Sequence, residues 1–191
     1  MRGGILVGTM VLAAAGAAMG QAPAPRQPLE STVQLSFEGN STVRSFKCTA
    51  KTINSNVVTD AVDATSASLA DLVTAASVII PVNDIDCANG TMNGHMRKAL
   101  KAEQAPEISF KLTSYEINGA NATLNGTLKI AGAENKIQLP ATVSPEATGV
   151  RVKSTKAIDM TQWGIKPPSL MMGTMKVKPT VNITFDVLVK R

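Results

Sequence analysis

The strongest constraint on the fold of this chain is a strict alternation of apolar and polar residues near its C-terminus. In residues 181–189 every odd position is Val, Ile or Phe, whereas the even positions include Asn182, Thr184 and Asp186. Successive side chains of a β-strand point to opposite faces of a sheet, so this period of two predicts an antiparallel strand with one buried face. The buried face must pack against other strands of the same kind.

Shorter versions of the same pattern recur along the chain, separated by turn-forming segments rich in Gly, Asn and Pro. Their apolar positions define the inward faces of further strands, and examples are Val33, Leu35 and Phe37; Ile108, Phe110 and Leu112; Leu124, Leu128 and Ile130; Ile137, Leu139 and Val143; and Val150 and Val152. About eight strands with hairpin spacing predict a mainly β domain, either a sandwich or a closed antiparallel barrel.

One segment has helical rather than strand periodicity. Met92, Met96 and Leu100 follow one another at intervals of four and form an apolar stripe. Pro106 stops the pattern, because the residue before a proline is disfavoured in the helical region. We therefore expect one short α-helix that caps or flanks the β structure.

The first residues have the features of a secretory signal peptide. Residues 1–22 contain an early positive charge at Arg2, an apolar run, and small residues at the expected cleavage point after Gly20 or Ala22. The run is short and diluted by glycine, whereas a membrane-spanning helix needs about 20 apolar residues. The sequence therefore predicts a bacterial protein that is exported to the periplasm or secreted.

Residues 23–31 are rich in proline and predict an extended, flexible leader. The remaining residues, 32–191, have a length typical of one domain with its own core. Lys and Arg number 19 against 14 Asp and Glu, and the basic residues are scattered. Because aromatic residues are also few, this charge favours a basic soluble surface over nucleic-acid binding, and it leaves a peripheral contact with anionic membranes open.

The chain has two cysteines, Cys48 and Cys87, which are 39 positions apart. Exported proteins keep disulfides, so the predicted export favours a bond between them over two unrelated buried thiols. Closing a loop of this length restricts the unfolded chain by about 3–4 kcal/mol on the chain-entropy model.

The sequence lacks the residue patterns of common enzymes, including a G-x-S-x-G elbow, C-x-x-C, H-E-x-x-H and a phosphate-binding loop. The single histidine, His95, has no partners at metal-ligand spacing, so we expect it to face solvent on the predicted helix. We therefore expect no catalytic residue, no bound metal and no cofactor. Three methionines, Met171, Met172 and Met175, leave a Cu(I) carrier open as an alternative, because thioethers favour that ion.

Four segments carry a resemblance to a known family when their order and spacing are considered together. They are FEGNSTVRSFKCTA, VIIPVNDIDCANGTMNGHMRKALKAEQAPEISFKL, LNGTLKIAGAENKIQLPATV and MTQWGIKPP. In these segments the chain resembles the YceI-like family, which comprises exported bacterial lipid- and polyisoprenoid-binding proteins. The resemblance spans residues 32–191. It departs from the family at Ser45, where His is common, and the cysteine pair belongs to only some members.

The resemblance implies a lipocalin-like antiparallel β-barrel of about eight strands, with one short α-helix and an elongated apolar cavity. An isoprenoid chain, such as that of a quinone, would lie in this cavity. On this hypothesis the ligand contacts inward strand residues, which are Phe110, Leu112, Leu128, Ile130, Ile183 and Phe185. The cavity entrance would be lined by Trp163, Ile165, Leu170, Met171, Met172 and Met175.

The size of the inward residues supports a hollow interior. Gly126 and Ala141 lie between bulky apolar positions, and a closed barrel of eight strands is just wide enough for packed side chains or one slender ligand. The same alternation is equally consistent with a structural or interaction barrel that has a filled core and no ligand. The sequence leaves the ligand and the oligomeric state open.

Overall fold

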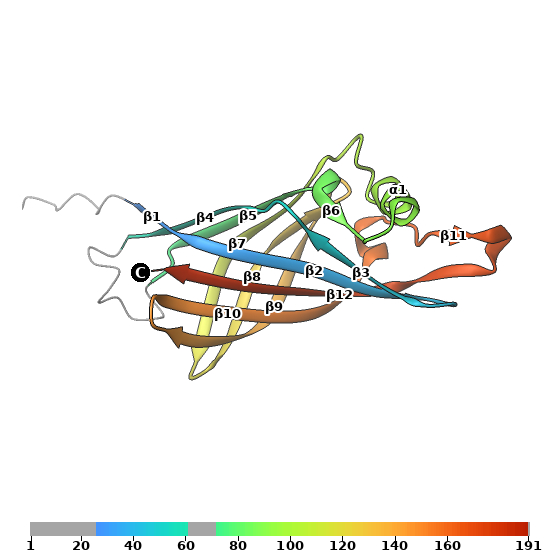
Figure 1. The fold of residues 1–191 in the computed structure, drawn as a ribbon. Coiled ribbons are helices and arrows are strands. Elements are labelled where there is room, and N and C mark those ends of the chain that lie inside the picture. The colour runs from blue at the N-terminus through green and yellow to red at the C-terminus, as the bar shows by residue number, and fades with distance from the viewer. Residues whose placement is uncertain (1–25, 61–71, 191) are drawn as a thin grey trace, which may run out of the picture.

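The computed structural model describes residues 26–60 and 72–190, apart from the side chain of Met171. The signal peptide predicted at residues 1–22 lies outside these ranges. The described residues form one strongly curled antiparallel sheet in the shape of a half-barrel, and the helix α1 (Gly90–Ala99) lies across one end of it (Figure 1). Neither this helix nor the 3₁₀ turns in the described ranges are long and apolar enough to cross a bilayer.

The sheet contains twelve strands, of very different lengths. They are β1 (Gln27–Leu29), β2 (Ser31–Ser41), β3 (Ser45–Ala50), β4 (Asn54–Thr59), β5 (Ala75–Pro81), β6 (Ile85–Asp86), β7 (Glu107–Asn118), β8 (Asn121–Ile130), β9 (Ala133–Glu146), β10 (Gly149–Asp159), β11 (Ser169–Leu170) and β12 (Met175–Lys190). Along the sheet their order is β1-β4-β5-β7-β8-β9-β10-β12-β2-β3-β6, and β11 pairs with β12 alone. Three 3₁₀ turns, η1 (Val82–Asp84), η2 (Met160–Trp163) and η3 (Met171–Gly173), connect them.

The mainly β class with one helix is confirmed, but the number of strands and the closure of the barrel are corrected. Strands β1, β6 and β11 have only two or three residues each, too few to show an alternating pattern. Strand β4 begins with three polar residues, Asn54–Ser55–Asn56. The order of the sheet runs from β1 to β6 without a ladder that joins its ends. Across this seam the hydroxyls of Ser31 on β2 and Ser55 on β4 lie 2.9 Å apart.

Part of the expected flexible leader is also corrected. Residues Gln27–Leu29 form strand β1, and Gln27 lies opposite Thr59 of β4. Because β1 is the end strand of the sheet, its proline, Pro28, does not interrupt a central ladder.

Strand β12 confirms the alternation from which the barrel was predicted. It pairs with β10 on one side and with β2 on the other, so Phe185 lies between Ser154 and Leu35. Val181 and Val189 are buried, whereas Asn182 is exposed on the outer face. A central position in the sheet explains why this strand has the clearest pattern in the sequence.

Helix α1 begins at a conventional cap and ends earlier than Pro106 suggested. The side chain of Asn89 accepts a hydrogen bond of 3.0 Å from the backbone NH of Met92. The helix ends at Ala99, and Lys101 adopts a left-handed conformation with φ of 55°. A further turn therefore separates the helix from the proline.

Candidate functional site

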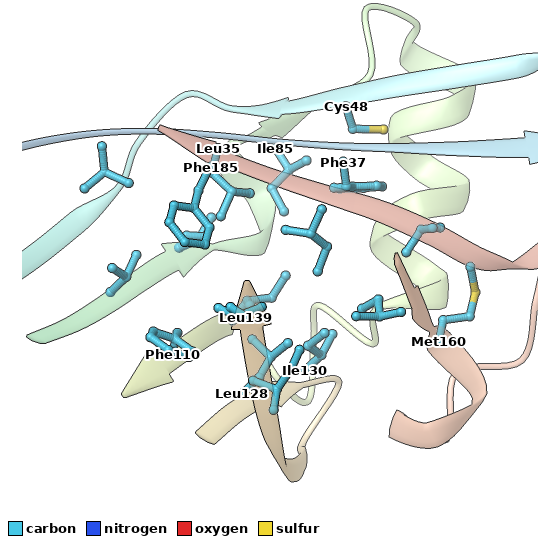
Figure 2. Close-up of a pocket in the computed structure, with 18 of the residues that line it drawn as sticks. Leu35, Phe37, Cys48, Ile85, Phe110, Leu128, Ile130, Leu139, Met160 and Phe185 are labelled. Atoms are coloured by element: carbon cyan, nitrogen blue, oxygen red, sulfur yellow. The ribbon is translucent and has the colours of Figure 1, made fainter. Parts of the chain in front are cut away.

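The curled sheet encloses an elongated cavity of about 770 Å³. Sites for small molecules typically have about 300–1,000 Å³. Figure 2 shows side chains from strands that face each other across the curled sheet converging on this space, among them Leu35, Phe110, Leu139 and Phe185. The interior is therefore hollow, in contrast to the filled core that the alternation alone left open.

The cavity extends along most of the length of β12. Its wall includes residues from Met175 at the start of this strand to Val189 near its end. At about 3.3 Å per residue, this stretch of strand is on the order of 45 Å long. The shape suits a long, thin molecule better than a compact one.

The structure places the predicted strand residues in the cavity wall. Phe110, Leu112, Leu128, Ile130, Ile183 and Phe185 all line the cavity. That they contact a ligand stays a prediction.

Only some of the residues predicted to line an entrance are found in the cavity wall. Ile165, Leu170 and Met175 line the cavity. Met172 is fully exposed and Trp163 is buried behind the wall, so neither of them lines it. Met171 lies in η3, and its side chain is outside the described part of the structure.

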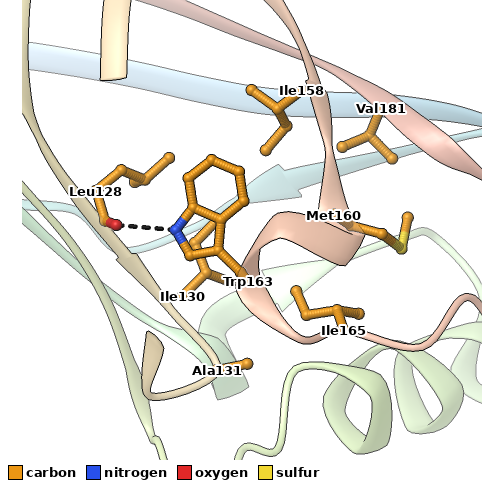
Figure 3. Close-up of a cluster of buried hydrophobic side chains, with 8 residues drawn as sticks. All are labelled: Leu128, Ile130, Ala131, Ile158, Met160, Trp163, Ile165 and Val181. Atoms are coloured by element: carbon orange, nitrogen blue, oxygen red, sulfur yellow. Dashed lines mark hydrogen bonds between the residues drawn. The ribbon is translucent and has the colours of Figure 1, made fainter. Parts of the chain in front are cut away.

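Trp163 anchors the wall of the cavity instead of lining its entrance. Its side chain is only 2% exposed, and its indole NH donates a hydrogen bond of 2.9 Å to the backbone carbonyl of Leu128 on β8. Figure 3 shows Ile158, Met160 and Ile165 packed around the ring. Periodicity could not reveal this role, because Trp163 belongs to a single 3₁₀ turn, which ends at Gly164 with φ of 66°.

The residues that line the cavity differ in exposure between its two ends. At the end near β1, the lining residues Val57, Leu72, Val150 and Val189 are buried. At the end near α1, the lining includes three exposed residues, Arg44, Asn89 and Thr91. The mouth of the cavity therefore lies beside α1.

The polar groups of the wall gather at this mouth. The polar lining residues there are Ser41, Arg44, Asn89, Thr91 and His95. His95 is half-buried and belongs to the wall at this mouth, so it is only partly exposed to solvent. Deeper in the cavity the hydroxyl of Tyr115 accepts a hydrogen bond of 3.3 Å from the backbone NH of Val73. The wall is thus apolar inside and polar at its opening.

Covalent and polar bonds hold α1 beside the mouth. The predicted disulfide is present and joins Cys48 of β3 to Cys87, just before the helix. The side chain of Asn93 accepts a hydrogen bond of 2.7 Å from the NH of Cys87 and donates one of 3.0 Å to Asp86. The bond from Asn93, followed by that from the backbone NH of Ala88, lowers the pKa of the Asp86 carboxyl below its ordinary value.

Two glycines give space to aromatic rings rather than to a ligand. A Cβ at Gly126 would collide with the ring of Phe110 and would lie 2.6 Å from the backbone carbonyl oxygen of Lys111. A Cβ at Gly39 would meet the ring of Phe46, whose Cε1 would be 2.9 Å away. The expectation that Gly126 leaves room for a ligand is therefore corrected, because Phe110 fills that room.

The fold and cavity agree with a comparison against known protein families. The model of the YceI-like domain matches residues 27–189. The chain belongs to the YceI-like family. This match covers every strand except the last residue of β12.

Solved structures of family members and related proteins have the same fold. BcnA from Burkholderia cenocepacia has 17% sequence identity and a TM-score of 0.67, over 81% of this chain and 94% of its own. A polyisoprenoid binding domain from Saccharophagus degradans, implicated in plant cell wall breakdown, has 14% identity and a TM-score of 0.61, over 85% and 97%. A YceI protein of Campylobacter jejuni has 18% identity and a TM-score of 0.61, over 76% and 85%. No curated protein matches the chain.

Proposed function

We propose that this protein is an exported, non-enzymatic binder of a long-chain lipid, with an isoprenoid such as a quinone as the preferred class. The observation that carries the proposal is the cavity of about 770 Å³, which is apolar along its length and polar at its mouth. A molecule with a long hydrocarbon tail and a small polar head complements this arrangement. The description of the Saccharophagus degradans relative as a polyisoprenoid binding domain supports the same class.

The energetics of burial favour such a ligand. Each buried CH₂ group contributes about 0.8 kcal/mol, so an isoprene unit of five carbons contributes about 4 kcal/mol before the entropy of binding is subtracted. Affinity for a tail of this kind does not require a charged anchor inside the cavity. It should rise with the number of isoprene units until the cavity is full.

The proposal is tested by native mass spectrometry after gentle purification, followed by extraction of bound lipid. We expect a mass heavier than that of the processed chain and uptake of offered isoprenoid quinones, with affinity increasing with tail length. A homogeneous apo mass, together with no uptake of any offered quinone or isoprenoid, would refute the proposal.

A variant that narrows the cavity locates the ligand. Val187 lies on the inner face of β12 and lines the cavity, whereas Thr184 is exposed on the outer face of the same strand. We expect Val187→Trp to reduce affinity for a quinone at least tenfold, whereas the matched control Thr184→Trp retains it. Equal affinity in both variants would place the ligand outside the cavity.

A further inference from the structure

The mouth of the cavity is flanked by two loops that are bonded to each other. The backbone NH of Thr42, in the turn between β2 and β3, donates a hydrogen bond of 2.9 Å to the carbonyl of Lys176. The hydroxyl of the same threonine donates one of 3.0 Å to the carbonyl of Thr174. We call this surface the tip and define it as residues 41–44 and 166–178. In Figure 1 it projects beyond α1, at the end opposite the C-terminus.

The tip exposes large apolar side chains. Val43 is 65% exposed and Met172 is 107% exposed. In the described ranges, only one other large apolar residue, Ile79 at 37%, is classed as exposed. Met172 also has φ of 54°, a left-handed conformation that disfavours any side chain. Single exposed apolar residues are common on protein surfaces, but here two lie on joined loops beside a cavity mouth.

The tip is also basic. Arg44, Lys166, Lys176 and Lys178 are exposed, and none of them forms an ion pair within residues 26–60 and 72–190. The sequence contains no Asp or Glu in residues 39–59 or 160–185, the two segments that form the tip and its base. These positive charges therefore have no carboxylate within their own segments to neutralise them.

Charges at the opposite end of the sheet are arranged differently. Arg151 lies 2.9 Å from Glu146 and 3.0 Å from Asp186, and Lys190 is bonded to Glu30. These two basic residues are thus neutralised by carboxylates, unlike those of the tip. Exposed lysines without an ion pair also occur on the outer face of the sheet, but Lys129, for example, lies opposite Glu134 there. What distinguishes the tip is that its own segments contain no carboxylate.

The tip and the cavity mouth are continuous. Ser41 and Arg44 from the first loop line the cavity, as do Leu170 and Met175 from the second. A partner bound at the tip would therefore face the opening directly. A surface that combines exposed apolar side chains with unpaired cations complements one partner best, a bilayer with anionic headgroups.

We propose that the tip docks this protein onto an anionic lipid surface, with Val43 and Met172 inserted at the headgroup boundary and the lysines close to the phosphates. Docked in this way, the mouth opens towards the bilayer, so a lipid tail passes between membrane and cavity with little exposure to water. The second statement rests on the proposed function, whereas docking itself does not. The proposal assigns a position and an orientation to the membrane contact that the net charge alone left open.

The contribution of the tip lysines to membrane binding can be estimated from their charges. A basic residue near an anionic surface strengthens binding by about fivefold at low ionic strength, and the effect falls off within a Debye length of about 8 Å at physiological salt. Replacing Lys166, Lys176 and Lys178 by Gln should therefore lower the partition coefficient about 100-fold. None of these three lysines lines the cavity.

The test is co-sedimentation of the processed chain with vesicles free of quinone, made either of phosphatidylcholine or of a mixture with phosphatidylglycerol. We expect binding to the anionic vesicles that weakens as salt rises. The matched control replaces Lys111, Lys129 and Lys136, exposed lysines of the sheet's outer face, by Gln and changes the net charge equally. Its loss of binding should be much smaller than that of the tip variant.

A second variant tests the apolar contact without threatening the fold. Val43→Ser with Met172→Gly removes both exposed side chains, and glycine suits the positive φ at position 172. We expect at least a tenfold loss of vesicle binding. Equal losses in the tip and control lysine variants, or equal binding to neutral and anionic vesicles, would overturn the proposal.

Quinone uptake in detergent, without vesicles, separates this proposal from the proposed function. Uptake without vesicle binding would overturn docking and leave the proposed function standing. Vesicle binding without uptake would support docking and refute the proposed function. The tip variants should keep the uptake of the unmodified chain, since their substituted side chains lie outside the cavity wall.

Discussion

Replacing Gly39 by Ala should destabilise the protein, because an aromatic ring occupies the place of the added methyl group. Gly39 is buried on β2 and lies opposite Phe46 of β3. The new Cβ would be 2.9 Å from Cε1 of Phe46 and closer still to Cζ, whereas ordinary contacts are 3.4–4 Å. Overpacking of this kind costs about 1–3 kcal/mol. For a chain of this size, that corresponds to a fall in melting temperature of about 2–12 °C.

Gly39→Ala should stabilise the protein, instead of destabilising it, when the aromatic ring of Phe46 is removed. Phe46→Leu lacks the ring atoms that the new methyl group would meet. Gly39 does not have a positive φ, so alanine at this position only restricts the unfolded chain and stabilises the protein by about 0.4–1 kcal/mol. A double-mutant cycle should therefore give a coupling energy of about 1.5–4 kcal/mol.

The pair Gly126 and Phe110 provides the control. Gly126→Ala should remain destabilising in a Phe110→Leu background, because the backbone carbonyl oxygen of Lys111 would still lie 2.6 Å from the new Cβ. Urea unfolding followed by circular dichroism measures all of these free energies. If Gly39→Ala destabilises the protein equally with Phe46 and with Leu at position 46, the explanation by ring contact is wrong.

Three further changes should alter stability in defined ways. Trp163→Phe should lower the free energy of unfolding by about 1–3 kcal/mol, since a buried carbonyl loses its indole donor; an unchanged urea midpoint would contradict this. Replacing Cys48 and Cys87 together by Ala should remove about 4 kcal/mol, and the same loss should follow reduction of the unmodified chain. The Asp86 carboxylate, whose pKa is lowered chiefly by Asn93, stabilises the fold fully above the ordinary aspartate pKa. This stabilisation should disappear as the pH falls through the lower folded-state pKa, and Asp86→Asn should show a smaller acid-dependent loss in pH-dependent thermal unfolding.

The sequence predicted the cavity wall correctly where one strand alone decides which way a side chain points. Ile183 and Phe185 were placed in the wall from their alternation with Asn182 and Thr184, and the structure has them there. No such argument is available for Trp163, because no period exists in a turn of four residues. Its burial depends on a carbonyl of Leu128, which is 35 positions away in the chain.

His95 shows the same limit for a helical residue. A single histidine on a short amphipathic helix indicates neither which face meets the sheet nor what lies below it. The position of α1 depends on the disulfide between Cys48 and Cys87 and on the bonds of Asn93, which together hold the helix beside the mouth. Because of those contacts, the side chain of His95 forms part of the cavity wall.

Local patterns in the sequence determined which residues form long strands, which faces of those strands are apolar, and which two cysteines are available to bond. They suffice because alternation is a property of neighbouring residues, and the family resemblance adds the order of the elements. The tertiary structure decided whether the interior is hollow and where it opens. Cavity volume depends on how far twelve strands curl and on which rings, such as those of Phe46 and Phe110, fill the space beside glycines. The tip is likewise formed by tertiary contacts, because the pairing of Ser41 with Val177 and the bond between Thr42 and Lys176 bring together charges far apart in the chain.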